Sequence, residues 1–258
     1  MHHGRVRLLG PYDIPGFSGR RHVRTYVPTR ARPTMRPLLF LFDGQNAFDD
    51  EPSFAGGLHV HAAVERLARA VSPPVVVAID HGHAERIREL SPFAIRRGPH
   101  ATPGDGAAFS RWIVETLIPE LRGPFALDPD PRHAVIGGTS MGGLAALITH
   151  AEHPEHFGGA LAMSPSLWVA RRAAFEHLRR TRLAPWSRVY IDAGRRESRG
   201  IAERDAGMAA ELLRTLDGES VLFRADPKGR HRETDWKRRL PAALRFFYGT
   251  SRAPRPTI

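Results

Sequence analysis

The 258-residue chain contains no cysteine, and this absence removes several kinds of chemistry at once. Disulfide frameworks, cysteine-ligated zinc, iron–sulfur clusters and thiolate nucleophiles all need the missing side chain. Long hydrophobic runs are also missing, since no apolar segment approaches the roughly 18 residues that a membrane-spanning helix needs. We therefore expect no membrane partner, and a nucleophile must come from another residue type.

Lysine is nearly absent as well. The chain has 38 basic and 27 acidic residues, and every basic residue except Lys228 and Lys237 is an arginine. A net charge of +11 would favour a nucleic-acid partner if the arginines gathered on one face. They are spread along the chain instead, in pairs such as Arg20-Arg21 and Arg179-Arg180. We interpret most of this charge as a solvated basic surface and expect no specific nucleic acid.

The first residues do not resemble a signal peptide. Their only apolar stretch is Leu8-Leu9, which Pro11, Asp13 and Pro15 soon interrupt. The sequence therefore predicts a cytoplasmic protein. Its content of 41% hydrophobic and 25% charged residues is typical of a globular domain. Because no long linker divides the chain, we expect residues 1–258 to form a single domain.

Apolar runs alternate with longer segments of helical periodicity along most of the chain. Strands are expected at Arg5–Leu9, His22–Val27, Pro37–Phe42, Pro74–Ile79, His133–Ile136, Ala160–Met163, Arg188–Ile191 and Ser220–Phe223. Helices are expected at Leu58–Val71, Phe109–Leu121, Leu144–His150, Ala170–Leu178, Ile201–Leu216 and Asp235–Tyr248. This alternation predicts an α/β fold with a mostly parallel central sheet and helices on both faces.

One segment carries the pattern of an activated nucleophile. Gly138-Thr139-Ser140-Met141-Gly142 matches G-x-S-x-G, in which a serine occupies a strained turn between a strand and a helix. The glycines are needed because a Cβ would collide with neighbouring backbone. The N–H groups at the start of the following helix favour a developing oxyanion. An expected strand precedes the motif and an expected helix follows, so Ser140 is the candidate nucleophile.

A serine nucleophile needs a histidine base and a carboxylate, which follow it in the order serine, acid, histidine. His231 is the only histidine beyond His177, and it lies between the last expected strand and the last expected helix. Asp192 and Glu197 both follow the strand at Arg188–Ile191. From residue chemistry alone, these two residues are nearly equal candidates for the acid.

Six ordered segments point to a family. They are Arg21–Pro28, Leu41–Asp49 (with D-G-Q-N-x-F-D), Arg86–Pro92 (R-x-x-E-L-x-P), Gly137–Leu144 (G-x-S-x-G-G-L), Ser164–Ser166 with Trp168, and Gly229–Trp236 (G-x-H-x-E-x-x-W). In these segments the chain resembles the putative esterase family of α/β-hydrolases. This family contains enterochelin, feruloyl and acetylxylan esterases, S-formylglutathione hydrolase and mycolyltransferases. The resemblance implies an α/β-hydrolase fold and an esterase activity that uses no cofactor.

The resemblance also assigns roles to individual residues. It favours Glu197 as the acid, because Gly194–Glu197 fits the family's G-x-x-[DE] segment. It implies that the N–H of Gln45, or of a neighbour in Gly44–Asn46, joins that of Met141 in an oxyanion hole. It also implies that Trp236 packs against the loop of His231. The chain departs from the family in having Gly229-Arg230-His231 where G-G-H is usual, and it lacks a tryptophan near Leu58–Val60. Both departures concern the substrate pocket.

Taken together, these observations predict a serine esterase that forms an acyl-enzyme on a small-molecule ester. An acyltransferase of the same family and a non-catalytic binding module of the same fold are the alternatives. Asn46, Trp168 and Arg230 are the candidate substrate-binding residues. The substrate itself stays open, because it depends on loops such as Phe48–Gly57 and Ser91–Ala108.

Charge and histidine spacing add two weaker expectations. The arginines beside the candidate acid and base suggest a preference for anionic or phenolate-bearing esters; they are Arg195, Arg196, Arg230 and Arg232. The histidine pairs His59/His61 and His81/His83 could chelate a metal in principle, but pairs without a set of carboxylates are a weak signal. We therefore expect no metal site.

Overall fold

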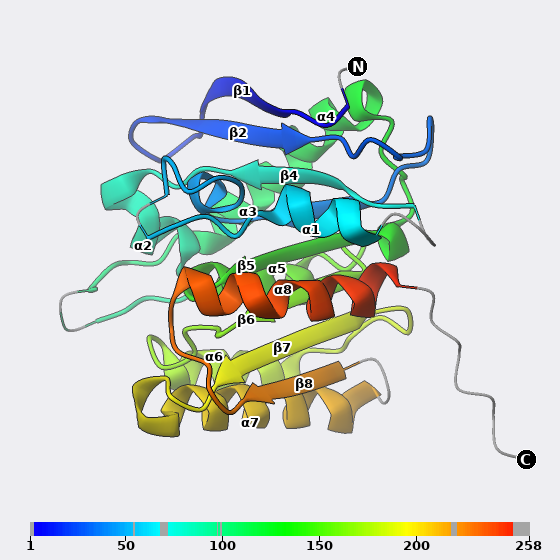
Figure 1. The fold of residues 1–258 in the computed structure, drawn as a ribbon. Helices are drawn as coiled ribbons and strands as arrows, with labels where there is room; N and C mark the ends of the chain where they lie inside the picture. Colours follow the sequence, from blue (N-terminus) through cyan, green and yellow to red (C-terminus); the bar gives the residue numbers. More distant parts are fainter. Residues whose placement is uncertain are drawn as a thin grey trace, which may run out of the picture.

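An eight-stranded sheet forms the centre of the computed structural model, which describes residues 3–53, 55–67, 72–96, 98, 100–217 and 221–249 (Figure 1). Its strands are β1 (Val6–Asp13), β2 (Arg20–Tyr26), β3 (Leu38–Leu41), β4 (Val75–Ile79), β5 (Ala134–Thr139), β6 (Gly159–Met163), β7 (Arg188–Gly194) and β8 (Val221–Asp226). They lie in the order β1-β2-β4-β3-β5-β6-β7-β8. β2 is antiparallel to β1 and β4, and all pairings from β4 to β8 are parallel.

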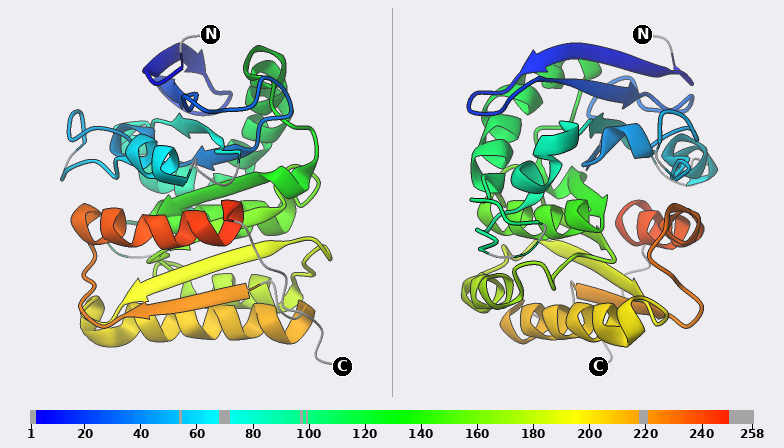
Figure 2. Two further views of the ribbon diagram at one scale, coloured as in Figure 1. Left: turned by 45° about the vertical axis from the view of Figure 1, so that its right-hand side comes forward. Right: turned by 90° about the vertical axis from the view of Figure 1, so that its left-hand side faces the viewer.

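Helices cover both faces of this sheet. They are α1 (Val60–Leu67), α2 (Arg86–Leu90), α3 (Gly106–Trp112), α4 (Ile118–Phe125), α5 (Met141–Glu152), α6 (Arg171–Arg180), α7 (Ile201–Asp217) and α8 (Glu233–Tyr248). α1 and α8 lie on one face, and α3 to α7 lie on the other (Figure 2). No helix in the described part of the chain has both the length and the apolar character needed to cross a membrane.

The central strands are buried on both faces, which explains their continuous apolar sequences. All six residues of β5 are buried. Val135 packs in the apolar layer under α1 and α8, whereas Ile136 packs in the opposite layer. Neighbouring residues reach opposite layers because successive side chains of a strand point to opposite faces. The prediction of a mostly parallel sheet with helices on both faces is confirmed.

Several boundaries differ from the sequence prediction. β5 continues beyond Ile136 through Gly137 and Gly138 to Thr139, because these residues pair with β6. There is little room for a side chain at Gly137, since a Cβ would lie 3.0 Å from the Leu161 Cβ. β1 extends past Pro11 to Asp13 with an irregular register, as an edge strand tolerates. The short helix α2 was not predicted. The part of the expected helix that follows Leu67 lies outside the described residues. Ser220, the first residue of the last expected strand, also lies outside them.

Some arginines do not belong to the solvated basic surface that the sequence predicts for most of the charge. Arg21, Arg36 and Arg239 are buried. Arg21 forms an ion pair with Glu89 of α2, which is also buried. A buried pair of this kind needs a well-matched partner to offset the loss of hydration. Part of the positive charge is therefore buried and is not available at the surface.

Candidate active site

Ser140 occupies the turn between β5 and α5. Its backbone has φ 57° and ψ −120°, a conformation that residues other than glycine rarely adopt. The turn is fixed by a hydrogen bond from Ser140 N–H to the carbonyl of Met163, with an N···O distance of 3.0 Å. A Cβ at Gly138 would lie 2.5 Å from the carbonyl carbon of Gly142, so the backbone crossing that lifts Ser140 requires glycine.

Gly138→Ala is therefore expected to destabilise the turn. The added methyl group would meet backbone atoms rather than a flexible side chain, so we expect the unfolding free energy to fall by roughly 1–3 kcal/mol. Gly123→Ala is the matched control, since no described atom beyond its neighbours and its own helix backbone lies within 4 Å of its Cβ position. Thermal unfolding of both variants tests this expectation, and equal unfolding temperatures would contradict it.

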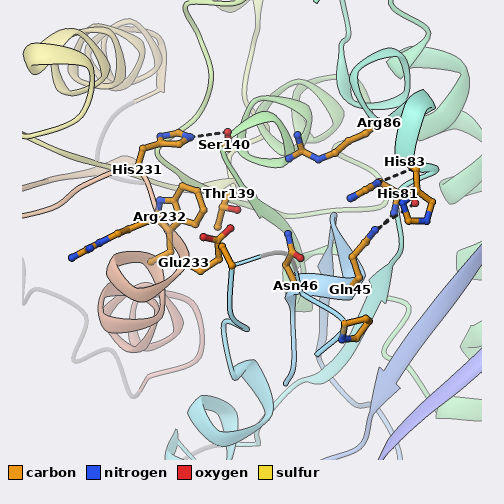
Figure 3. A pocket seen from close by; sticks show the side chains of 13 residues that line it. Gln45, Asn46, His81, His83, Arg86, Thr139, Ser140, His231, Arg232 and Glu233 are labelled. Atoms are coloured by element: carbon orange, nitrogen blue, oxygen red, sulfur yellow. Dashed lines mark hydrogen bonds between the residues drawn. The ribbon is translucent and has the colours of Figure 1, made fainter. Parts of the chain in front are cut away.

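His231 links the nucleophile to an acid. Its Nε2 lies 2.8 Å from Ser140 Oγ, a contact drawn in Figure 3. Its Nδ1 lies 2.9 Å from Oε2 of Glu197. An ionised carboxylate can only accept hydrogen bonds, so Nδ1 carries the hydrogen. Nε2 of the neutral ring is then free to accept the proton of the Ser140 hydroxyl. The structure thus brings Ser140, His231 and Glu197 together in one hydrogen-bonded chain.

The surroundings of Glu197 keep it ionised although it is buried. Burial raises its pKa, but hydrogen bonds to the carboxylate outweigh this effect and hold the pKa below its usual value. Besides His231, the donors are the hydroxyl of Ser164 and the backbone N–H of Gly194, each with a donor–acceptor distance of 2.7 Å to Oε1. A permanently charged carboxylate suits a residue that must stabilise a protonated histidine.

Asp192, the alternative acid, is buried and has no hydrogen bond to His231 within the described residues. Its Oδ1 accepts a hydrogen bond from the N–H of Ser164 at 3.3 Å and lies 3.4 Å from Nη2 of Arg239. Burial raises its pKa to about 7 in spite of the neighbouring guanidinium. Of the two acids that residue chemistry left open, Glu197 is the one that contacts the histidine.

Trp236 contacts His231 and also Ser164, the residue whose hydroxyl donates to Glu197. Its ring meets the imidazole of His231 edge to face, with 4.9 Å between ring centroids. Its Nε1–H donates to Ser164 Oγ at 2.9 Å, and Arg239 Nη2 donates to the same oxygen at 2.8 Å. The packing against the His231 loop that the resemblance implies is therefore present, with Ser164 as an additional shared contact.

A cavity of about 710 Å³ opens beside Ser140. Its lining is mixed in polarity and consists of Gln45, Asn46, Pro52, Ala55, His81, His83, Arg86, Thr139, Ser140, His231, Arg232, Glu233 and Trp236. Gln45 and Asn46 are thus placed at the cavity as expected, and Pro52 and Ala55 come from the loop Phe48–Gly57.

Other expected contacts are not part of this lining. Trp168 is 50% exposed and packs beside His100. Arg230 is exposed, and no described residue of the loop Ser91–Ala108 belongs to the lining. The sequence interpretation missed His81, His83 and Arg86, although Arg86 begins the R-x-x-E segment. Folding brings them in because the segment after β4 packs against α5, where Arg86 of α2 pairs with Asp43 in the loop after β3.

The expected cluster of arginines around the site is only partly present. Of the four proposed, Arg232 alone lines the cavity, and its Nε lies 2.6 Å from Asp235 Oδ2. Arg195 is paired with Glu203 at 3.0 Å. Arg86 is paired with Asp43 through two hydrogen bonds of 2.7 and 2.8 Å. Arg232, Arg195 and Arg86 each have a carboxylate partner. Arg196 and Arg230 are exposed and do not belong to the lining, so the four arginines give little support to a preference for anionic esters.

The candidate oxyanion hole lies where α5 and the loop after β3 meet. Met141 is the first residue of α5, so its N–H has no acceptor within the helix. Gln45 lies in the 3₁₀ turn Gly44–Asn46, whose geometry uses the N–H of Asn46 for a 2.9 Å bond to the carbonyl of Asp43. Because the N–H of Asn46 is already used, the N–H of Gln45 is a better candidate oxyanion donor than that of Asn46.

Side-chain contacts hold this turn in place. The amide group of Gln45 accepts from the N–H of His81 at 3.1 Å, and it donates to the His81 carbonyl at 3.5 Å. The guanidinium group of Arg86 forms an ion pair with Asp43, which begins the turn and has φ 58°.

The histidine pair His59/His61 contacts single carboxylates, His59 with Asp50 and His61 with Asp49. No cluster of three metal-ligating side chains occurs among the residues that the structure describes.

Comparison with known sequences identifies similar proteins. A family model described as putative esterase matches residues 15–247. An iron(III) enterobactin esterase of Dickeya dadantii is 35% identical over 139 residues, which are 53% of this chain and 27% of that protein. An iron(III) enterobactin esterase of Escherichia coli is 26% identical over 233 residues, which are 87% of this chain and 52% of that protein. The chain therefore spans at most 52% of the length of these two relatives.

Comparison with solved structures supports the fold. The BES protein of Bacillus cereus superposes with a TM-score of 0.76 at 20% identity, and the match covers 96% of both chains. The enterobactin esterase FES of Shigella flexneri also gives a TM-score of 0.76, at 23% identity, covering 94% of this chain and 58% of that one. The shared architecture is the α/β-hydrolase fold, as the sequence predicts.

Proposed function

Because the chain belongs to the putative esterase family, we propose that it is a serine esterase that hydrolyses carboxylic esters through an acyl-enzyme. The observation that carries this proposal is the hydrogen-bonded chain from Ser140 through His231 to Glu197. A hydroxyl, an imidazole and a carboxylate in this arrangement constitute an activated nucleophile.

In the first step, Ser140 Oγ attacks the ester carbonyl and its proton passes to His231 Nε2. Glu197 stabilises the resulting imidazolium through the hydrogen bond at Nδ1. The carbonyl oxygen becomes an oxyanion, which the N–H groups of Met141 and Gln45 would hold. When the tetrahedral intermediate collapses, the alcohol leaves with the proton from Nε2 and the acyl group stays on Ser140.

In the second step, water attacks the acyl carbon and gives a proton to His231 Nε2. The acid is then released, and the proton returns to Ser140 Oγ. The cavity opens directly beside Ser140 and admits the water. An alcohol bound in the same place would give acyl transfer instead of hydrolysis.

Product analysis with p-nitrophenyl acetate tests this proposal. We expect one free acetate per p-nitrophenol released, and this ratio should persist when an alcohol such as glycerol is added. A shift of most acetyl groups to the alcohol would indicate an acyltransferase, and absence of turnover with every ester tried would favour a binding module. Because the relatives are named for iron(III) enterobactin, enterobactin belongs in the substrate panel.

A further inference from the structure

A second serine hydroxyl contacts the candidate nucleophile. Ser166 lies in the loop after β6, and its Oγ is 3.1 Å from Ser140 Oγ. The residue is only 2% exposed. Buried hydroxyl groups in proteins nearly always have a hydrogen-bond partner. Within the described residues, the partner found for this side chain is the oxygen atom that attacks the substrate in the proposed mechanism.

The backbone holds Ser166 at this place independently of its side chain. The N–H of Ser166 donates to the carbonyl of Ser140 at 2.9 Å. The preceding Pro165 packs close to the start of α5, where a Cβ on Gly143 would come within 3.3 Å of the proline Cα. The position of the loop therefore does not depend on the hydroxyl, and removal of the hydroxyl alone should leave the turn intact.

The direction of the hydrogen bond follows from the rest of the chain. Glu197 accepts from Nδ1 of His231, so Nε2 accepts the single hydroxyl hydrogen of Ser140. Ser140 Oγ has no second hydrogen to donate, so Ser166 must be the donor to it. We propose that Ser166 is a further catalytic residue, whose hydroxyl stabilises Ser140 Oγ as that oxygen leaves the acyl-enzyme. This inference rests on the proposed esterase function.

The benefit is expected mainly in deacylation. In the free enzyme the Ser166 hydrogen bond already exists, so it changes little when Ser140 attacks. In the acyl-enzyme, Ser140 Oγ is the alkoxy oxygen of an ester, which accepts hydrogen bonds poorly. When the second tetrahedral intermediate collapses, the bond between the acyl carbon and Oγ breaks and its electron pair goes to Oγ. The proton comes from His231 Nε2, and Ser166 keeps its own. A contact that strengthens toward the transition state accelerates the step.

Ser166→Ala tests the inference. We expect kcat for p-nitrophenyl acetate to fall about tenfold, which corresponds to the free energy of one hydrogen bond to a partly charged oxygen. Covalent labelling by a fluorophosphonate requires attack by Ser140 but no deacylation, so its rate should change less than about threefold. Acetyl-enzyme should also accumulate during turnover and be visible by intact mass spectrometry. Ser110→Ala, which removes a buried hydroxyl bonded to Ala107 O at 3.1 Å, is the matched control and should behave like the native protein.

Two outcomes would overturn the inference. An unchanged kcat in Ser166→Ala would show that the hydroxyl does not assist turnover. An equal fall in kcat and in labelling rate would show that it only supports the shape of the turn. Failure of the native protein to react with the fluorophosphonate at all would be a different result, because it would contradict the proposed function itself.

Discussion

Replacing Ser140 by alanine is expected to lower kcat for p-nitrophenyl acetate at least about 10⁴-fold. The remaining rate would come from the oxyanion donors and the binding of substrate, which need no nucleophile. Alanine lacks only the hydroxyl, and the hydrogen bond that fixes the turn involves the backbone N–H of residue 140. The unfolding temperature should therefore stay close to that of the native protein.

Activity assays of purified Ser140→Ala check this expectation, with Ser110→Ala as a control for loss of a serine hydroxyl elsewhere. A variant that keeps full activity would remove Ser140 from the mechanism. If the variant lost both activity and cooperative unfolding, Ser140→Gly would separate catalysis from folding, because glycine also lacks the hydroxyl and adopts φ 57° without strain.

Glu197→Gln is expected to lower kcat by about 10³–10⁴-fold. The amide keeps the shape of the carboxylate but removes the charge that stabilises protonated His231. Its NH₂ group can also donate to Nδ1, which would place the ring hydrogen on Nε2 and block proton acceptance from Ser140. Steady-state kinetics at neutral pH measures the effect.

Asp192→Asn is the informative companion to this variant. Burial raises the pKa of Asp192 to about 7, so the neutral form, which an amide resembles, is already populated near neutral pH. It also has no hydrogen bond to His231 among the described residues. We expect a change in kcat of less than about tenfold, corresponding to one adjusted hydrogen bond. A large loss in Asp192→Asn together with a small loss in Glu197→Gln would reverse the assignment.

The arrangement of strands was largely accessible from the sequence. The central strands are buried on both faces, so segments such as Val75–Ile79 are apolar without interruption and stand out. The exact ends were harder to predict. Gly137 and Gly138 suggested the end of a strand, whereas the close approach of β6 and of α5 requires these glycines within β5. Short α2 lacks enough residues to display a helical period.

The candidate site was accessible only in part. Local turn chemistry pointed to Ser140, and the order of elements pointed to His231. Sequence chemistry could not separate Asp192 from Glu197, because the difference lies in where each carboxylate points after folding. His81 and Arg86 reach the cavity through the packing of the segment after β4 on the sheet. Whether an arginine is free or paired likewise depends on long-range contacts, such as that of Arg86 with Asp43.

The most direct test of the esterase mechanism is mass spectrometry of the protein after reaction with a fluorophosphonate. We expect one adduct per chain, located on Ser140 by peptide mapping, with loss of p-nitrophenyl acetate hydrolysis in proportion to labelling. Ser140→Ala should remain unlabelled. An adduct on a different residue, or full hydrolytic activity in completely labelled protein, would contradict the assignment of Ser140 as the nucleophile.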